Sequence, residues 1–137
     1  MPAVSNSAPP ILWSPDAARV ERSQLTRFTR WLAAERGVEV DGYDALWRWS
    51  VDELEQFWGA IWDYFEVVAH TPYERVLGSR EMPGAQWFPG ATLNYAEHVF
   101  RGRADDAVAI RHASETRPLA ELRWGELKAL TARIAAA

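Results

Sequence analysis

The first apolar run along the chain has helical spacing. It predicts a helix over Pro15–Arg22 that is capped by Ser14, with a proline at the first helical position. The helix either continues or restarts at Ser23, because apolar residues keep the spacing of three and four further on. These residues are Leu25, Phe28, Trp31 and Leu32. Gly37 is placed to end the helix as a left-handed cap.

The most regular periodic run predicts a helix from about Val51 to Val67, preceded by a short helical turn over residues 43–49. Ser50 and Glu53 match a capping box at its start. Its apolar residues define one wide face: Leu54, Phe57, Trp58, Ile61, Trp62 and Phe65. We expect this aromatic face to pack against the Leu25–Leu32 helix or against a larger body.

Prolines and glycines interrupt residues 68–90, which predicts an extended connection that follows a surface. Four apolar residues are expected to anchor it: Val76, Leu77, Met82 and Trp87. A connection of this length without elements is uncommon in a small domain, so the covering surface is expected to lie elsewhere. The next stretch, 86–100, predicts an aromatic turn at Pro89–Gly90 and then a short helix over 92–100 with Thr92 as its cap.

Alternating residues predict two paired strands, at 107–111 and 119–123, joined by a turn over 113–116. A helix follows from Trp124 and shows no stop signal before Ala137, so we expect the chain to be cut inside an element. Two strands are too few for a sheet that is stable alone. The predicted fold class is mainly α with a small β-hairpin.

Composition narrows the function classes. The 137 residues are 48% hydrophobic and 25% charged, typical of a globular protein, and eight tryptophans need burial in a core or against a partner. A net charge of −4 argues against a nucleic-acid partner. No apolar run approaches the roughly 18 residues of a membrane span. The absence of cysteine permits a cytoplasmic location. Residues 1–12 are predicted to be a disordered tail.

Candidate chemistry is sparse. The sequence contains no phosphate-binding loop of the G-x-x-x-x-G-K-[ST] type and no G-x-G-x-x-G. The three histidines, His70, His98 and His112, lack the spacing of zinc ligands. Asp105 and Asp106 are adjacent, which favours a solvated loop over an acid/base pair. Ser114 lies near His112 but lacks an identifiable third partner. We therefore predict no catalytic, cofactor-binding or metal-ligating residue in this chain.

Three segments carry a resemblance. They are ILWSPDAARVERSQLTRFTRWL at 11–32, YDALWRWSVDELEQFWGAIWDYF at 43–65, and WFPGATLNYAEHVF at 87–100. In this order they resemble the N-terminal region of acetoacetate–CoA ligases (acetoacetyl-CoA synthetases), which are relatives of acetyl-CoA synthetase in the acyl-adenylate-forming superfamily. The resemblance implies a helical N-terminal segment over 13–100. It also implies the first strands and helix of a truncated α/β AMP-binding (adenylation) domain over 101–137.

The resemblance further implies a full enzyme that uses ATP and Mg²⁺ to activate acetoacetate or another short carboxylate, and then transfers the acyl group to CoA. The family's phosphate loop and catalytic lysine would lie beyond residue 137, and Lys128 matches neither. Arg123 stands where relatives often have a threonine cap. The chain is expected to be inactive alone and to need the rest of the adenylation domain as its partner. The alternatives are a fragment of an acetyl- or propionyl-CoA synthetase and a small helical interaction module.

Overall fold

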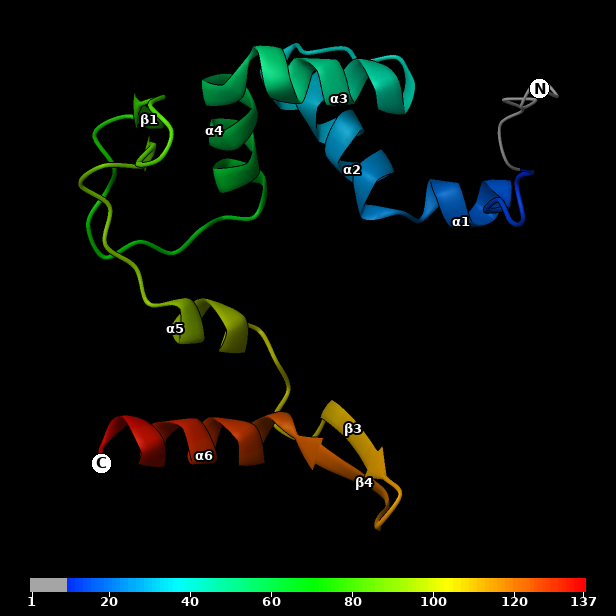
Figure 1. Ribbon diagram of the computed structural model, residues 1–137, viewed down its shortest axis with the longest axis vertical. Helices are drawn as coiled ribbons and strands as arrows, with labels where there is room; N and C mark the ends of the chain where they lie inside the picture. The colour runs from blue at the N-terminus through cyan, green and yellow to red at the C-terminus, as the bar shows by residue number, and fades with distance from the viewer. Residues whose placement is uncertain (1–9) are drawn as a thin grey trace, which may run out of the picture. The chain divides into compact units, whose positions relative to one another are not determined.

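The computed structural model describes residues 10–137, which form two compact units (Figure 1). The first unit ends at Glu66 and the second begins at Val67. Residues 1–9 of the predicted tail lie outside the described residues. The predicted domain boundary between residues 100 and 101 stays a prediction.

The first unit opens with two helices in place of one. Helix α1 (Ala17–Glu21) is capped by Asp16, whose carboxylate accepts a hydrogen bond from the Arg19 amide at 2.7 Å. The predicted cap at Ser14 is wrong, because Asp16 has the extended backbone of a cap and a charge that suits a helix N-terminus. The alternative of a restart at Ser23 is confirmed: Ser23 caps α2 (Gln24–Trp31).

A π-helical turn, η1 (Leu32–Arg36), follows α2 directly. Gly37 ends it with φ of +64°, as predicted for a left-handed cap. The glycine has open space around its Cα, so the backbone conformation alone selects it.

Helix α3 (Gly42–Asp52) and helix α4 (Leu54–Tyr64) meet at a break at Glu53. The predicted capping box at Ser50 is wrong, because the preceding turn is a full helix that runs through it. The Ser50 hydroxyl donates to the Trp47 carbonyl, three residues back, at 2.7 Å. A serine that bonds in this way can remain inside a helix. The backbone leaves the helical region only at Glu53, with φ of −110° and ψ of 56°.

The core of the first unit lies where α2, α3 and α4 meet. Its buried residues are Phe28, Leu32, Leu46 and Ala60. The predicted packing between the aromatic helix and the Leu25–Leu32 helix is confirmed, since the Phe28 ring lies 6.2 Å from Phe57 and 5.1 Å from Tyr64. Trp58 and Phe65 of the predicted face are about two-fifths exposed, so their packing against a larger body stays a prediction.

The second unit begins with an irregular antiparallel ladder. Strand β1 (Leu77–Ser79) pairs with β2 (Gln86–Trp87), and Thr71 forms an isolated bridge with Thr92. The prediction of a connection without elements is therefore wrong over this stretch. The frequent prolines and glycines of this stretch prevented the sequence pattern from revealing two short strands, of three and two residues. Of the predicted anchors, Leu77 is buried, whereas Met82 is 84% exposed.

Helix α5 (Tyr95–Phe100) starts later than predicted. Its cap is Asn94, whose side-chain oxygen accepts hydrogen bonds from the amides of Ala96 and Glu97 at 3.0 and 3.3 Å. The predicted cap at Thr92 is wrong, because its hydroxyl donates to the Thr71 hydroxyl at 2.8 Å. The threonine closes the ladder and is no longer available to the helix.

The predicted hairpin and final helix are confirmed as β3 (Val108–Ser114), β4 (Arg117–Arg123) and α6 (Trp124–Ala135). The strands are longer than predicted and the turn is shorter. Arg123 is the N-cap residue of α6, and its amide donates to the Glu126 carboxylate at 2.8 Å, as in a capping box. The Gly125 amide donates to the Asp105 carbonyl at 3.0 Å, so the preceding loop satisfies another free amide.

The fold class is mainly α with small β-hairpins, in agreement with the sequence prediction. Within residues 10–137, every helix is too short or too polar to cross a membrane.

Candidate functional site: an apolar surface on the helical unit

An open apolar hollow lies beside the core of the first unit. Its volume is about 230 Å³, and its lining comes from α2, α3 and α4: Leu25, Phe28, Tyr43, Leu46, Trp47, Ser50, Phe57 and Ile61. Phe28 and Leu46 are buried and form its floor. Tyr43 and Trp47 are 67% and 55% exposed and form its rim. We call this set of residues the α3 surface.

The periodicity of α3 builds this surface. Tyr43, Trp47 and Ser50 lie three and four residues apart, so they share one face of the helix. Leu46 lies beside them and turns into the core, while Trp49 packs against Phe57 with ring centroids 5.7 Å apart. Trp49 is thus partly buried against the core, whereas Trp47 is exposed at the surface. The sequence predicted a helical turn over residues 43–49 and did not separate the two tryptophans.

A second hollow, also of about 230 Å³, adjoins the first. The two share Leu25, Tyr43 and Leu46, and the second extends to Val20 and Val40. The apolar surface therefore continues from α3 across α2 to the end of α1. An exposed apolar surface of this extent is typical of an interaction site.

The chemistry available in the α3 surface is limited to binding. Its polar side chains are the hydroxyls of Tyr43 and Ser50, and the Ser50 hydroxyl is already bonded to the Trp47 carbonyl. The lining contains no carboxylate, imidazole or amine that could transfer a proton. The surface therefore suits an apolar partner and not a reacting substrate.

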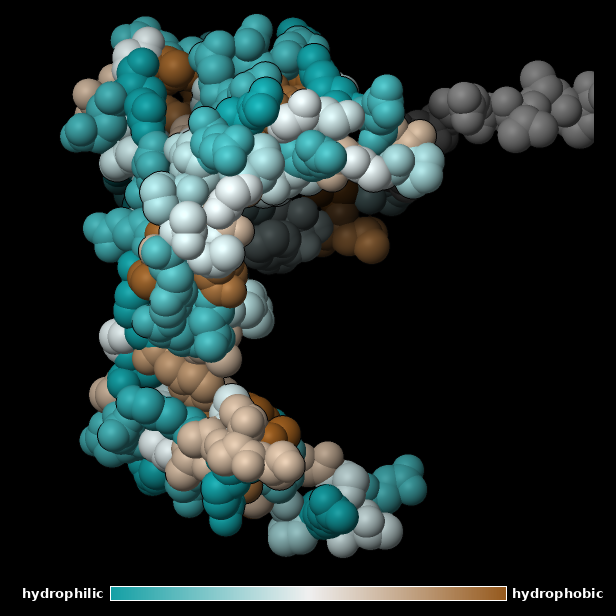
Figure 2. Space-filling view, turned by 90° about the vertical axis from the view of Figure 1, so that its left-hand side faces the viewer, coloured by the Kyte–Doolittle hydropathy of each residue, from teal (hydrophilic) through white to brown (hydrophobic). Residues whose placement is uncertain are grey.

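The second unit also exposes apolar side chains on its hairpin and final helix. The largest are Ile110, Leu119, Leu130 and Ile134, which are 38% to 77% exposed. Figure 2 shows apolar surface at the lower end of the view, where α6 lies. No residue of β3, β4 or α6 is buried. This part of the second unit lacks a core of its own in the described chain.

A more polar hollow of about 320 Å³ lies in the second unit, lined by Val68, Glu97, Phe100, Arg101 and Lys128. The carboxylate of Glu97 is engaged by the His70 ring, with Nε2 and Oε2 2.7 Å apart. Lys128, the only lysine of the chain, lies at this hollow and on α6.

The structure does not bring the other chemistry-bearing residues together. His70 pairs with Glu97, whereas His98 has a buried Nδ1 without a hydrogen-bond partner, and His112 lies on β3. Within residues 10–137, no three His, Asp or Glu side chains are grouped so that they could hold a metal ion.

Asp105 and Ser114 have structural surroundings. The Asp105 carbonyl receives the Gly125 amide, and its Cβ is the atom that a side chain at Gly125 would meet first, at 3.1 Å. The Ser114 hydroxyl lies 3.4 Å from the Thr116 hydroxyl, across the turn between β3 and β4. Among the described residues, neither side chain forms a hydrogen bond or ion pair with a histidine.

Comparison with known proteins relates this arrangement to one enzyme class. Residues 43–99 match the family model described as acetyl-coenzyme A synthetase N-terminus. The chain is 36% identical to an acetoacetyl-coenzyme A synthetase of Rhizobium meliloti, over 90% of this chain and 19% of that protein. It is 34% identical to an acetoacetyl-CoA synthetase of Danio rerio, over 93% of this chain and 19% of that protein.

A solved structure agrees with these relatives. Acetoacetyl-CoA synthetase from Streptomyces lividans superimposes with a TM-score of 0.80 at 50% identity, over 93% of this chain and 21% of that protein. The chain spans about a fifth of the length of the relatives it matches.

The fold and the matched residues define a class first: this is an N-terminal segment of the acyl-CoA synthetase type. Within that class, the chain is similar to acetoacetyl-CoA synthetases over about a fifth of their length. The resemblance predicted from the sequence is thereby confirmed.

Proposed function

We propose that this chain serves as the N-terminal part of an ATP-dependent acetoacetate–CoA ligase. The whole protein would form an acyl-adenylate with release of pyrophosphate, and would then transfer the acyl group to CoA. One observation carries the proposal: the 50% identity to the Streptomyces lividans enzyme, at a TM-score of 0.80 over nearly the whole chain.

The chain's own contribution is packing. The α3 surface and the exposed residues of β4 and α6 would be buried against the remainder of the adenylation domain. Residues 13–100 would act as the helical segment and 101–137 as the first strands and helix of that domain. The absence of cysteine supports a cytoplasmic location.

We place the sites for ATP, Mg²⁺ and CoA outside the described residues. These residues include no grouped acidic side chains for a metal ion, and the sequence has no glycine-rich phosphate loop. We therefore derive no chemical step through these groups in this chain. Their binding, and the choice of carboxylate, would belong to the rest of the protein.

A second candidate function is a small helical interaction module, and the exposed α3 surface favours it. A different carboxylate, acetate or propionate, remains the alternative within the ligase class. The two function classes differ in whether the chain supports catalysis when it is joined to a synthetase body.

A chimera tests the proposal. Residues 1–137 replace the matching N-terminal fifth of the Streptomyces lividans enzyme, and ATP–pyrophosphate exchange is measured with acetoacetate and with acetate. We expect the chimera to exchange with acetoacetate, and the isolated chain to show no exchange with either acid. The same enzyme without its N-terminal fifth is the control.

Two results would contradict the proposal. A soluble, folded chimera that is no more active than the truncated control would show that the chain does not perform the segment's role. Exchange by the isolated 137-residue chain would show that it carries chemistry of its own.

A further inference from the structure

Three exposed apolar residues lie near the start of the described chain, before α1. We call them the tip. Ile11, Leu12 and Trp13 are 87%, 93% and 68% exposed. They precede α1, which has no buried residue. The Arg19 guanidinium lies over the Trp13 ring at 5.6 Å, and Asp16 caps the helix between them, so the indole is attached to α1. We call residues 10–21 the arm.

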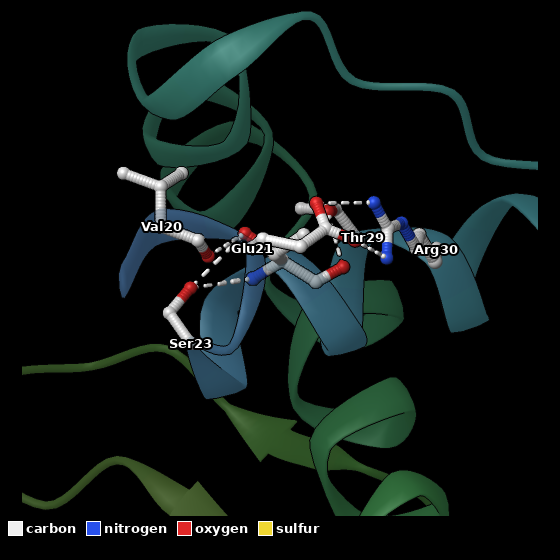
Figure 3. A network of polar contacts seen from close by, with 6 residues as sticks. Val20, Glu21, Ser23, Thr29 and Arg30 are labelled. Carbon is white, nitrogen blue, oxygen red and sulfur yellow. Dashed lines mark hydrogen bonds and ion pairs between the residues drawn. The ribbon is translucent and has the colours of Figure 1, made fainter. Parts of the chain in front are cut away.

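A hydrogen-bond network fixes the arm to α2 (Figure 3). The Ser23 hydroxyl donates to the Thr26 hydroxyl at 3.0 Å and accepts from the Thr26 amide at 3.1 Å. The Thr26 hydroxyl donates back to the Val20 carbonyl at 2.7 Å. One threonine thus links the last turn of α1 to the first turn of α2.

A salt bridge also joins α1 to α2. We call the junction of these two helices, residues 20–30, the elbow. The Arg30 guanidinium contacts both oxygens of the Glu21 carboxylate, at 2.6 and 2.7 Å. A bidentate pair fixes geometry better than a single contact does. The carboxylate's hydrogen bond with Arg30, and then the charge of that arginine, lower the pKa of Glu21.

The elbow directs the tip away from the core of its own unit. In Figure 1, α1 leads away from α2 and does not lie along α3 or α4. Folding the tip back onto the α3 surface would break the Val20–Thr26 and Glu21–Arg30 contacts. Of α1, Val20 at its end reaches the adjoining hollow. The arm therefore presents three apolar side chains to something outside the first unit.

We propose that Ile11–Leu12–Trp13 is a docking anchor that inserts into an apolar recess on the remaining four-fifths of the synthetase. This inference rests on the proposed function. The relatives are about five times as long as this chain, so a large tethered partner is implied. A surface on the same polypeptide is met at far higher effective concentration than a second copy of the chain. Tryptophan is enriched among the residues that carry most of the binding energy at protein interfaces.

Trypsin reads out the docking directly, because Arg19 and Arg22 lie in and beside α1 and are exposed. The chimera and the isolated chain are digested side by side, and cleavage after Arg19 and Arg22 is followed by mass spectrometry. We expect cleavage to be roughly tenfold slower in the chimera, because proteolysis follows the population of the undocked arm and about 1.4 kcal/mol of docking lowers that population tenfold. Trp13→Ala should remove the protection, and Trp13→Phe should keep most of it.

Charge-reversal variants test whether the Glu21–Arg30 salt bridge of the elbow is needed for docking. Glu21→Arg and Arg30→Glu each replace the pair by two like charges and should raise cleavage in the chimera toward the rate of the isolated chain. The double variant Glu21→Arg/Arg30→Glu restores opposite charges and should restore protection. The acetoacetate-dependent exchange of each preparation is measured in parallel.

Equal cleavage of the chimera and the isolated chain would overturn the docking proposal. So would protection of the isolated chain, which indicates a second copy if it grows with protein concentration and the chain's own surface if it does not. An active chimera with an unprotected arm overturns this inference and leaves the proposed function standing. An inactive chimera with a protected arm overturns the proposed function and supports the docking.

Discussion

At the scale of single residues, the first unit depends on a few buried side chains. Leu32 is fully buried, and Phe28, Leu46 and Ala60 surround it at 4% to 5% exposure. With so few buried residues, a single truncation removes a large share of the core.

Leu32→Ala should therefore lower the free energy of unfolding by about 2–5 kcal/mol, the range for a buried leucine that leaves a cavity. Leu25→Ala is the matched control, since Leu25 is 44% exposed and should cost less than about 1 kcal/mol. Urea unfolding followed by tryptophan fluorescence measures both. Equal losses would show that Leu32 is not the centre of the core.

The sequence identified this core only in part, and the reason is geometric. Helical spacing placed Phe28 and Leu32 on the inner face of their helix, where the structure has them. It did not divide Trp47 from Trp49. Residues two apart lie on nearly opposite sides of a helix, and local spacing did not show which side faces the core. The packing of α3 against α2 and α4 decides which tryptophan contacts the core, and that packing depends on side chains far away in the sequence.

The Glu21–Arg30 pair should make α1 sensitive to acid. Because the pKa of Glu21 is lowered in the folded chain, the pair stabilises α1 above the ordinary carboxylate pKa of roughly 4.3 and this contribution is lost as the pH falls through the lowered value. Helical Cα chemical shifts of Arg19 and Val20, measured from pH 7 to pH 3, should fall in the wild-type chain. In Glu21→Gln they should be low throughout. Wild-type shifts that stay constant down to pH 3 would contradict the prediction.

At the scale of elements, the helix caps show where local rules compete. Ser14, Ser50 and Thr92 all satisfied the sequence pattern of a cap, and each gave way to another residue: Asp16, the break at Glu53, and Asn94. Ser50 and Thr92 instead form other hydrogen bonds, to the Trp47 carbonyl and the Thr71 hydroxyl. The Trp47 carbonyl is a local partner that becomes available because the helix continues through Ser50. The Thr71 hydroxyl is brought to Thr92 by tertiary structure, which spacing alone does not reveal.

Asn94→Ala should destabilise α5 by about 1 kcal/mol, because two amides lose their acceptor. Asn94→Asp retains a carboxylate oxygen at the cap and should remain close to the wild type. Hydrogen exchange of the Ala96 and Glu97 amides reports the change at the helix itself. Similar protection of these amides in Asn94→Ala and the wild type would rule out Asn94 as the cap.

At the scale of the whole molecule, both units expose apolar surface that a globular protein ordinarily buries. Tyr43 and Trp47 form the rim of the α3 surface, and Leu119 and Ile134 are more than 70% exposed in the second unit. The sequence predicted this need for a partner from its tryptophan content and its two-stranded sheet. It could not locate the surface, because no conserved chemical motif distinguishes an interface tryptophan from a core one.

The isolated chain should bind the dye anilinonaphthalene sulfonate through the α3 surface. The variant Tyr43→Ser/Trp47→Ser should reduce the bound fluorescence, while Met82→Ser, which removes an isolated exposed side chain, should leave it nearly unchanged. If the two variants bind the dye equally, the α3 surface is not the principal apolar surface.

The central claim is that this chain completes a synthetase by packing and supplies no catalytic group. Its most direct test is to add the purified 137-residue chain to the Streptomyces lividans enzyme that lacks the matching fifth, and to measure acetoacetate-dependent ATP–pyrophosphate exchange as the chain is titrated. Exchange should rise and saturate with the wild-type chain, and Tyr43→Ser/Trp47→Ser should need a higher concentration for the same effect. Exchange that stays at the level of the truncated enzyme, at every concentration of a folded wild-type chain, would contradict the claim.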